Sequence, residues 1–136
     1  MNVRDCMKSP VFTVTPDTLM DDALETMREK HVRRLPVVEN GKLVGLVTRN
    51  IIRGAMPSSP TPLTLWGLHY QLSRMKVRDV MITDVIVVHP DDTIKEVLAL
   101  IEKHRIGTFP VVDDNGNLVG ILTSTDLLHI VAKLLD

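Results

Sequence analysis

Apolar side chains recur at helical spacing in two stretches of the chain, residues 17–31 and 94–101. In the first they are Leu19, Ala23, Leu24 and Met27, and in the second Ile94, Val97, Leu98 and Ile101. Spacings of three and four residues place such side chains on one face of a helix. Each stretch is therefore predicted to form an amphipathic helix, and Asp17 or Thr18 is the expected N-cap of the first.

Short runs rich in β-branched residues flank each predicted helix. "VFTVT" and "VIVVH" come before the helices and end at Pro-Asp, where proline cannot donate to a sheet. "RLPVVE" and "LVGLV" are joined by Asn-Gly, the strongest short hairpin signal, and "FPVVD" and "LVGIL" repeat the arrangement. A second helix is predicted to begin near Thr48 and near Thr123, both suited to N-capping. The predicted element order is therefore β-α-β-β-α, twice.

The two halves of the chain are copies of one unit. "VRDCM" at residues 3–7 recurs as "VRDVM" at residues 77–81, an offset of 74. Asp114 is inserted in the second copy, after which "NGKLVGLVT" recurs as "NGNLVGILT" at an offset of 75. This indicates a tandem duplication of a unit of about 55 residues. One unit alone would expose an apolar sheet face that a second copy buries, so an α+β fold of two packed repeats is predicted.

The segment between the copies has a different character. "PSSPTP" is typical of a loop, and Leu65, Leu68 and Leu72 then lie on one face of a predicted short helix. That helix is expected to dock across the two repeats or onto a partner chain. Trp66 and Tyr70 are interpreted either as core residues between the repeats or as ligand contacts. The two repeats are placed at residues 7–66 and 81–136.

Composition narrows the function classes. The 136 residues carry 16 Lys and Arg against 17 Asp and Glu, and aromatic residues make up 3%, which disfavours nucleic-acid binding. The single Cys6 excludes an intrachain disulfide, and the histidines lack metal-ligand spacing, so no metal site is expected. No signal-peptide core or membrane-length apolar run occurs, which favours a cytoplasmic protein without membrane contacts.

The stretch "VRDVM…VIVVHPDDTIKEVLALIEKHRIGTFPVVDDNGNLVGILTSTD" resembles the cystathionine-β-synthase (CBS) domain. The resemblance rests on an "hPVVD" strand, an Asn-Gly turn and a "GhhTxxD" motif in that order. It covers nearly the whole chain except the segment between the copies. The pair resembles a Bateman module, in particular the stand-alone CBS proteins of the acetoin-utilisation type.

The resemblance implies a specific arrangement and ligand class. Two CBS repeats are expected to pack about a pseudo-twofold axis and to leave two clefts for an adenosine-containing ligand: AMP, ADP, ATP or S-adenosylmethionine. Modules of this kind are expected to form a flat homodimer. The "TxxD" of one repeat would hold the ribose. The start of the other repeat and its strand before "PVV" would hold the base and the phosphates.

Carried onto this chain, the motif predicts a strong site, cleft A. A carboxylate suits a ribose because it accepts from both vicinal hydroxyls in charge-assisted hydrogen bonds. Asp126 lies three residues after Thr123, so both face the same side of a first helical turn. Lys8 and two arginines would meet phosphates. Because a strand alternates its faces, only one of Arg33 and Arg34 is expected to point into the cleft, and the other to be a solvated surface charge; Arg33 is the preferred candidate. The alternative for Asp126 is a purely capping charge. The cleft A residues are Lys8, Ser9, Val11, Arg33, Arg34, Leu35, Thr123, Thr125 and Asp126.

The first copy of the motif predicts a weaker site, cleft B. Its "TxxD" position is Ile51, which cannot accept a hydrogen bond, and Arg49 is its one nearby cation. Losing a charge-assisted pair of bonds costs roughly 1.5–3 kcal/mol, or about tenfold to a hundredfold in affinity. Cleft B is therefore expected to bind weakly, differently or not at all. Its residues are Thr48, Asn50, Thr83, Val85, Gly107, Thr108 and Phe109.

The function predicted from the sequence is a regulatory sensor of AMP, ADP or ATP that signals through a homodimer to an unidentified protein. No catalytic acid–base pair or metal site is recognisable, so an enzyme is not expected. Three alternatives stay open: an S-adenosylmethionine sensor, a purely structural dimerisation module, and an enzyme that acts on the bound nucleotide.

Overall fold

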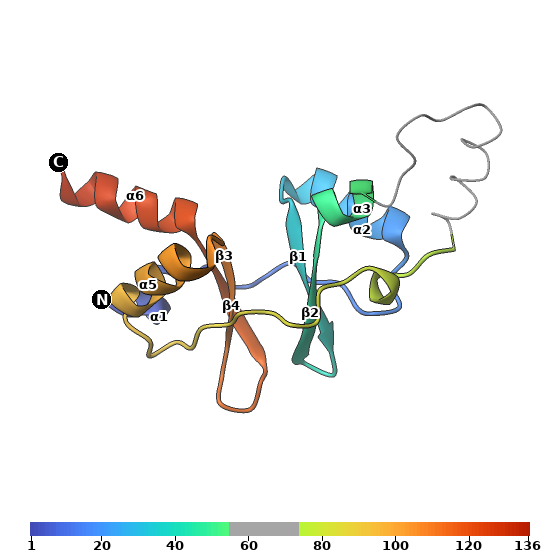
Figure 1. Cartoon of the computed structure of the whole chain (residues 1–136), viewed down its shortest axis with the longest axis horizontal. Helices are drawn as coiled ribbons and strands as arrows, with labels where there is room; N and C mark the ends of the chain where they lie inside the picture. Colours follow the sequence, from blue (N-terminus) through green and yellow to red (C-terminus); the bar gives the residue numbers. More distant parts are fainter. Residues whose placement is uncertain (55–73) are drawn as a thin grey trace. The chain divides into compact units, whose positions relative to one another are not determined.

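The computed structural model describes residues 1–54 and 74–136, which divide into two compact units. The N-terminal unit is Phe12–Val85. The C-terminal unit combines Met1–Val11 with Ile86–Asp136. Each unit contains one antiparallel hairpin and its helices (Figure 1).

The N-terminal unit is built around one hairpin. Strands β1 (Arg34–Glu39) and β2 (Lys42–Thr48) pair antiparallel through a turn at Asn40 and Gly41. Both turn residues have positive φ, 54° and 81°, which matches the predicted tight Asn-Gly hairpin. Its helical elements are α2 (Met20–Lys30), α3 (Arg49–Gly54) and the 3-10 turn η1 (Val77–Asp79). Its core includes Met20, Ala23, Met27, Leu35, Val37, Val47, Ile52 and Val77.

The C-terminal unit repeats this plan. Strands β3 (Thr108–Val112) and β4 (Leu118–Thr123) form its antiparallel hairpin. Its helices are α1 (Val3–Cys6), α5 (Ile94–His104) and α6 (Ser124–Leu134). Its core contains Val3, Val88, Val97, Phe109, Val111, Leu122 and Leu127. The α+β fold class and the two repeats predicted from the sequence are thus confirmed.

The first predicted strand of each repeat is wrong in extent. "VFTVT" is reduced to one parallel bridge between Val14 and Val37, in which Val14 donates to Pro36 and accepts from Val38. The ladder cannot extend in either direction because Pro36 and Pro16 both lack the N–H that the next bond needs. "VIVVH" behaves in the same way, with one bridge from Val88 to Val111.

The predicted N-cap of α2 is also wrong. The helix begins at Met20 with Leu19 as its N-cap, and no side chain caps it. Thr18 is not available because its hydroxyl accepts from the Thr15 amide at 3.0 Å and closes the preceding turn. In the second repeat the position equivalent to Leu19 is Thr93, which caps α5 through the Glu96 amide.

The segment before each repeat packs in the unit of the other repeat. In α1, the Val3 and Arg4 amides donate to the Asp92 and Pro90 carbonyls of the second repeat. In η1, Val77 and Arg78 bond in the same way to Thr18 and Pro16 of the first. Val3 and Val77 are both fully buried. The two "VRD" phrases are therefore exchanged between the units, which the repeat pattern alone did not predict.

Glycine is required where the exchanged segments cross the hairpins. Lys8 pairs with Ile121 on β4, directly beside Gly120. A Cβ at Gly120 would lie 2.6 Å from Met7 Sδ and 3.1 Å from the Lys8 carbonyl oxygen. The equivalent Gly45 meets the other exchanged segment just as closely, with its Cβ position 2.9 Å from the Ile82 carbonyl oxygen. The glycines that open the two motifs "GLVT" and "GILT" thus leave room for the exchanged backbone.

Two predictions involve residues 55–73. The helix carrying Leu65, Leu68 and Leu72, with Trp66 and Tyr70, lies outside the described residues. The repeat boundaries at 7–66 and 81–136 stay predictions.

Candidate functional site

Asp126 lies at the junction of β4 and α6, in a reciprocal N-terminal cap. Its amide donates to Thr123 Oγ1 at 3.2 Å, while its own Oδ2 accepts from the Thr123 amide at 2.9 Å and from the Thr123 hydroxyl at 3.0 Å. The residue is 6% exposed. Because the cap involves only Oδ2, it fixes the direction of the other carboxylate oxygen.

That second oxygen is held by the exchanged N-terminal segment. Lys8 Nζ lies 3.0 Å from Asp126 Oδ1, and the lysine side chain is 69% exposed. Lys8 is positioned by its backbone pairing with Ile121, which places it beside the start of α6. The geometry thus joins a buried carboxylate to a solvent-facing cation. An incoming hydroxyl pair would meet Oδ1 by sharing it with Lys8 or by displacing the ammonium group.

The environment keeps Asp126 ionised. Burial is the largest single influence and acts to raise the pKa of this carboxyl group. The Thr123 amide, the Lys8 ammonium group and the Thr123 hydroxyl together outweigh burial and lower the pKa below its ordinary value of 3.8. The carboxylate is therefore a permanent acceptor at neutral pH.

The lowered pKa predicts a pH dependence of stability. The ionised Asp126 stabilises the fold fully above pH 3.8, and this contribution disappears as the pH falls through the lower pKa of the folded state. Asp126→Asn should therefore reduce the free energy of unfolding at about pH 6 and reduce it less at about pH 3. Urea unfolding of the wild type and the variant at the two pH values measures the gap between their free energies of unfolding. A gap that stays constant down to the lower pH would contradict the prediction.

The equivalent β2–α3 junction of the N-terminal unit has the threonine cap but no carboxylate at the position of Asp126. Thr48 Oγ1 accepts from the Ile51 amide at 3.1 Å, as Thr123 does from Asp126. The Ile51 side chain has no oxygen that could accept from the Thr48 amide in return. The position equivalent to Lys8 is Ile82. Both members of the Lys8–Asp126 pair are thus replaced by isoleucine in the other copy. This paired replacement is the sequence signal that would have linked Lys8 to Asp126 rather than to a phosphate.

The predicted site residues are divided between the two units. Lys8, Thr123 and Asp126 come together as described, and Ser9, Val11 and Thr125 belong to the same C-terminal unit. The N-terminal unit contains exposed Arg33 and Arg34, and also Thr48, Asn50, Thr83 and Val85. Leu35 and Phe109 are fully buried in the cores of their units, so a ligand would reach their backbone rather than their side chains. Gly107 and Thr108 precede Phe109 at the start of β3.

The described residues contain neither a metal-ion cluster nor a membrane-spanning helix. In residues 1–54 and 74–136, no group of three or more His, Cys, Asp and Glu side chains is arranged to hold a metal ion. No helix in the same ranges is both long and apolar enough to cross a membrane.

The family follows from the repeats and from a direct comparison. The CBS domain family model matches residues 3–58 and 77–133, which is most of the chain. The protein therefore belongs to the CBS-domain family and contains a pair of CBS domains. The chain spans 40% of an uncharacterised relative from Methanocaldococcus jannaschii and 93% of a CBS domain-containing protein from Dictyostelium discoideum. It is 31% identical to each, over 97% and 98% of its own length.

Solved structures share the fold across the whole chain. A candidate acetoin utilization protein (AcuB) from Vibrio cholerae is 32% identical, with a TM-score of 0.82 over 99% of this chain and 93% of that one. CBSX2 of Arabidopsis thaliana in complex with AMP is 28% identical, with a TM-score of 0.82 over 99% and 98%. The CBS domain pair of protein MJ0100 was solved with 5′-methylthioadenosine and S-adenosyl-L-methionine; it is 27% identical, with a TM-score of 0.79 over 98% and 97%.

Proposed function

We propose that this protein is a regulatory module that binds an adenosine-containing ligand through Asp126. The observation that carries the proposal is the buried, ionised carboxylate whose Oδ1, within residues 1–54 and 74–136, is paired only with the exposed Lys8. A ribose diol can replace that contact with two charge-assisted hydrogen bonds. Two similar CBS pairs contain adenosine-derived ligands, AMP in one and S-adenosyl-L-methionine with 5′-methylthioadenosine in the other.

Among adenosine ligands, the charges favour a nucleotide. Lys8, once displaced from Asp126, remains near the carboxylate as a flexible cation, and Arg33 and Arg34 are the predicted phosphate contacts from the N-terminal unit. AMP, ADP and ATP carry phosphates that such groups neutralise, whereas S-adenosylmethionine carries a sulfonium cation. S-adenosylmethionine is the second candidate because a similar CBS pair holds it.

Unequal occupancy of the two motifs is the second part of the proposal. The β4–α6 junction has a charged acceptor, Asp126. The equivalent β2–α3 junction has Ile51 at that position and no charged acceptor. We therefore propose one strong site, cleft A. Cleft B is weak or empty for the same ligand.

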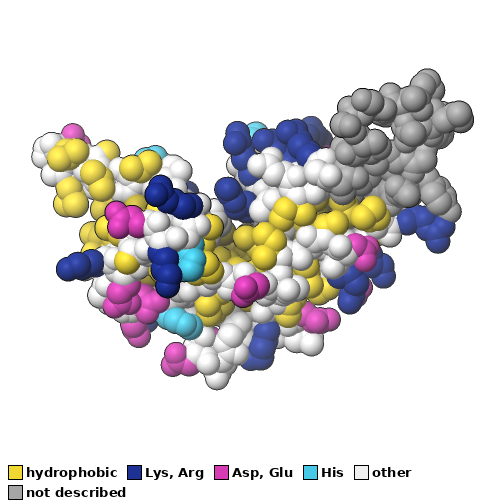
Figure 2. All heavy atoms as spheres, in the orientation of Figure 1, with side chains coloured by type: hydrophobic (Ala, Val, Ile, Leu, Met, Phe, Trp, Pro, Cys, Tyr) yellow, Lys and Arg dark blue, Asp and Glu magenta, His cyan; other side chains and the backbone are white. Residues whose placement is uncertain are grey.

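The output of the sensor would pass through a homodimer. Large apolar side chains are exposed along α6 and on α5: Leu98, Leu128, Val131, Leu134 and Leu135. Figure 2 shows hydrophobic side chains gathered over α6. Burial of such a surface against a second copy would favour association. A ligand would act through its different affinity for two states of that assembly.

Calorimetric titration tests the function. Purified protein, free of nucleotide, is titrated with AMP, ADP, ATP and S-adenosylmethionine, and sedimentation of the same samples reports the oligomer. We expect one dominant site per chain, tighter for a nucleotide, on a dimer. Two equal sites would contradict the asymmetry. If the protein is a dimer and no ligand produces binding heat, the structural dimerisation module is favoured. If new nucleotide products appear after incubation with a divalent metal, an enzyme is favoured.

A further inference from the structure

A pocket lies wholly inside the N-terminal unit, between α2 and α3. Its volume is about 350 Å³, at the lower end of the roughly 300–1,000 Å³ typical of small-molecule sites. Apolar Leu24, Met27 and Val32 line it together with cationic Arg28, Arg49 and Arg53. None of these residues belongs to the β4–α6 junction at Asp126, so this pocket is separate from cleft A. Arg49 is the cation that the sequence assigned to the weaker cleft B.

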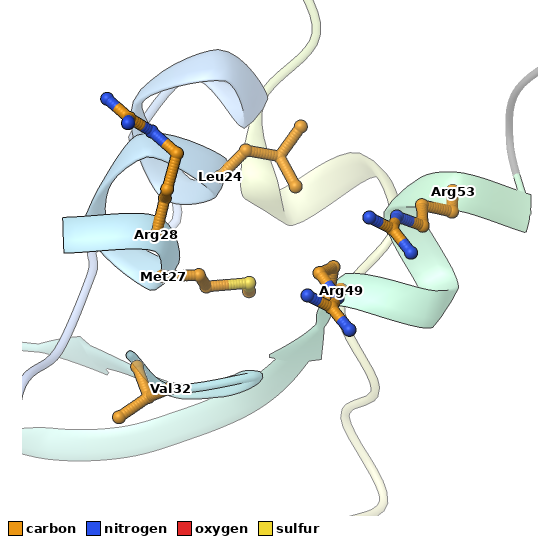
Figure 3. A pocket seen from close by; sticks show the side chains of 6 residues that line it. All are labelled: Leu24, Met27, Arg28, Val32, Arg49 and Arg53. Carbon is orange, nitrogen blue, oxygen red and sulfur yellow. The ribbon is translucent and has the colours of Figure 1, made fainter. Parts of the chain in front are cut away.

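Among the described residues, two of the three guanidinium groups have no counter-charge. Arg28 is bound to Glu25 and points away from the other two (Figure 3). Arg49 and Arg53 lie side by side on α3 in the same view. Neither makes an ion pair within residues 1–54 and 74–136, and the enclosed Nε of Arg49 has no hydrogen-bond partner. An enclosed cationic donor without a partner is costly and needs an explanation.

In the described part of the chain, two other positive charges act on the Arg49 guanidinium group and repel it. The charge of Arg53, followed by burial and by the charge of Arg33, lowers the pKa of Arg49 below its ordinary value. Arg33 lies close because its carbonyl accepts from the Arg49 amide at 2.9 Å. An anion between the guanidinium groups would offset this repulsion and satisfy the free Nε donor.

The second repeat shows that the fold does not need these cations. The equivalents of Arg49 and Arg53 are Ser124 and Leu128, and the equivalent of Arg33 is Gly107. The backbone bond is retained, since the Ser124 amide donates to the Gly107 carbonyl at 2.8 Å. The apolar lining is also retained, as Leu98, Ile101 and Ile106. Only the positive charge is specific to the first repeat, which points to a ligand rather than to packing.

We propose that the α2–α3 pocket binds a phosphoryl group through the guanidinium groups of Arg49 and Arg53. Arginine presents planar, paired N–H donors that match phosphoryl oxygens. The apolar wall of Leu24, Met27 and Val32 excludes water from one side and strengthens those contacts. The phosphoryl group belongs either to a free inorganic anion or to the phosphate chain of a nucleotide.

Titration with pyrophosphate and with ATP tests this proposal on the full chain. The test variant Arg49→Ser/Arg53→Leu introduces the residues of the second repeat, and Lys95→Ser removes a cation from exposed α5 as the matched control. We expect pyrophosphate to bind the wild type and Lys95→Ser equally, and to bind the double variant at least about tenfold more weakly. Asp126→Ala should leave pyrophosphate binding unchanged, which separates this site from the proposed adenosine site.

The two sources of the phosphoryl group give different results. A free anion predicts that the double variant loses pyrophosphate binding and keeps its affinity for ATP. A nucleotide phosphate chain predicts that it also loses a second, weaker ATP site and keeps the ATP site that depends on Asp126. Arg49→Lys/Arg53→Lys keeps the charge without the guanidinium donors and should bind with intermediate affinity, which excludes loss of folding as the cause. Unchanged affinity of the double variant for both ligands, or no binding of either by the wild type, would overturn the proposal.

Discussion

Asp126→Ala should weaken binding of the adenosine-containing ligand by about tenfold to a hundredfold, because two charge-assisted hydrogen bonds to the ribose are worth roughly 1.5–3 kcal/mol. The substitution also removes the partner of Lys8 and half of the reciprocal cap with Thr123. Calorimetric titration of the variant against the wild type measures the loss. The enthalpy should change with the affinity, since hydrogen bonds rather than apolar contacts are removed.

A second variant separates binding from stability. Asp126→Asn keeps one oxygen that can accept from the Thr123 amide, loses the charge, and replaces the second acceptor oxygen with an NH2 donor. It should retain most of the cap and lose most of the ribose affinity. The reverse experiment uses the other copy, where Ile51→Asp with Ile82→Lys reproduces the pair and should create a second site. Full affinity in Asp126→Asn would show that the carboxylate only caps α6.

The sequence predicted the parts of the fold that are set by local chemistry. Asn40 and Gly41 specified the hairpin because few other residues adopt positive φ in succession. Thr123 specified the start of α6 because its hydroxyl accepts a first-turn amide. The sequence also singled out Asp126, whose role in binding stays a prediction. It placed Lys8 in the same cleft, but as a phosphate contact rather than as the partner of the carboxylate.

The errors have equally specific causes. The strand at Val14 was overestimated because its apolar pattern is real, yet prolines in both paired segments remove the donors that would extend it. The packing of the "VRD" segments did not follow from the duplication, which shows which residues are equivalent but not which copy they contact. The family resemblance placed Lys8, Ser9 and Val11 beside the motif of the second repeat, but said nothing of the buried "VRD" residues. The cationic pocket was missed because Arg49, Arg53 and Arg33 converge only after α3 folds back beside the start of β1.

The exchange of the "VRD" segments predicts a destabilisation that appears in the opposite repeat. Val3 is fully buried in the core of the C-terminal unit, against residues that include Val88 and Val97. Val3→Asp removes that burial and places a carboxylate in an apolar core, which should cost at least about 3 kcal/mol. Hydrogen exchange should show the loss of protection in β3, β4 and α5, while β1 and β2 stay protected.

The mirror substitution is the matched control. Val77→Asp places the same charge at the equivalent buried position of the N-terminal unit, beside Thr18 and Pro16. It should expose the amides of β1 and β2 and leave β3 and β4 protected. The two variants change equivalent residues of the repeat, so opposite exchange patterns can only come from where each segment packs. If Val3→Asp instead loosened the hairpin of its own repeat, the exchange would be wrong, and Lys8 would no longer be positioned beside Asp126 by the fold of the C-terminal unit.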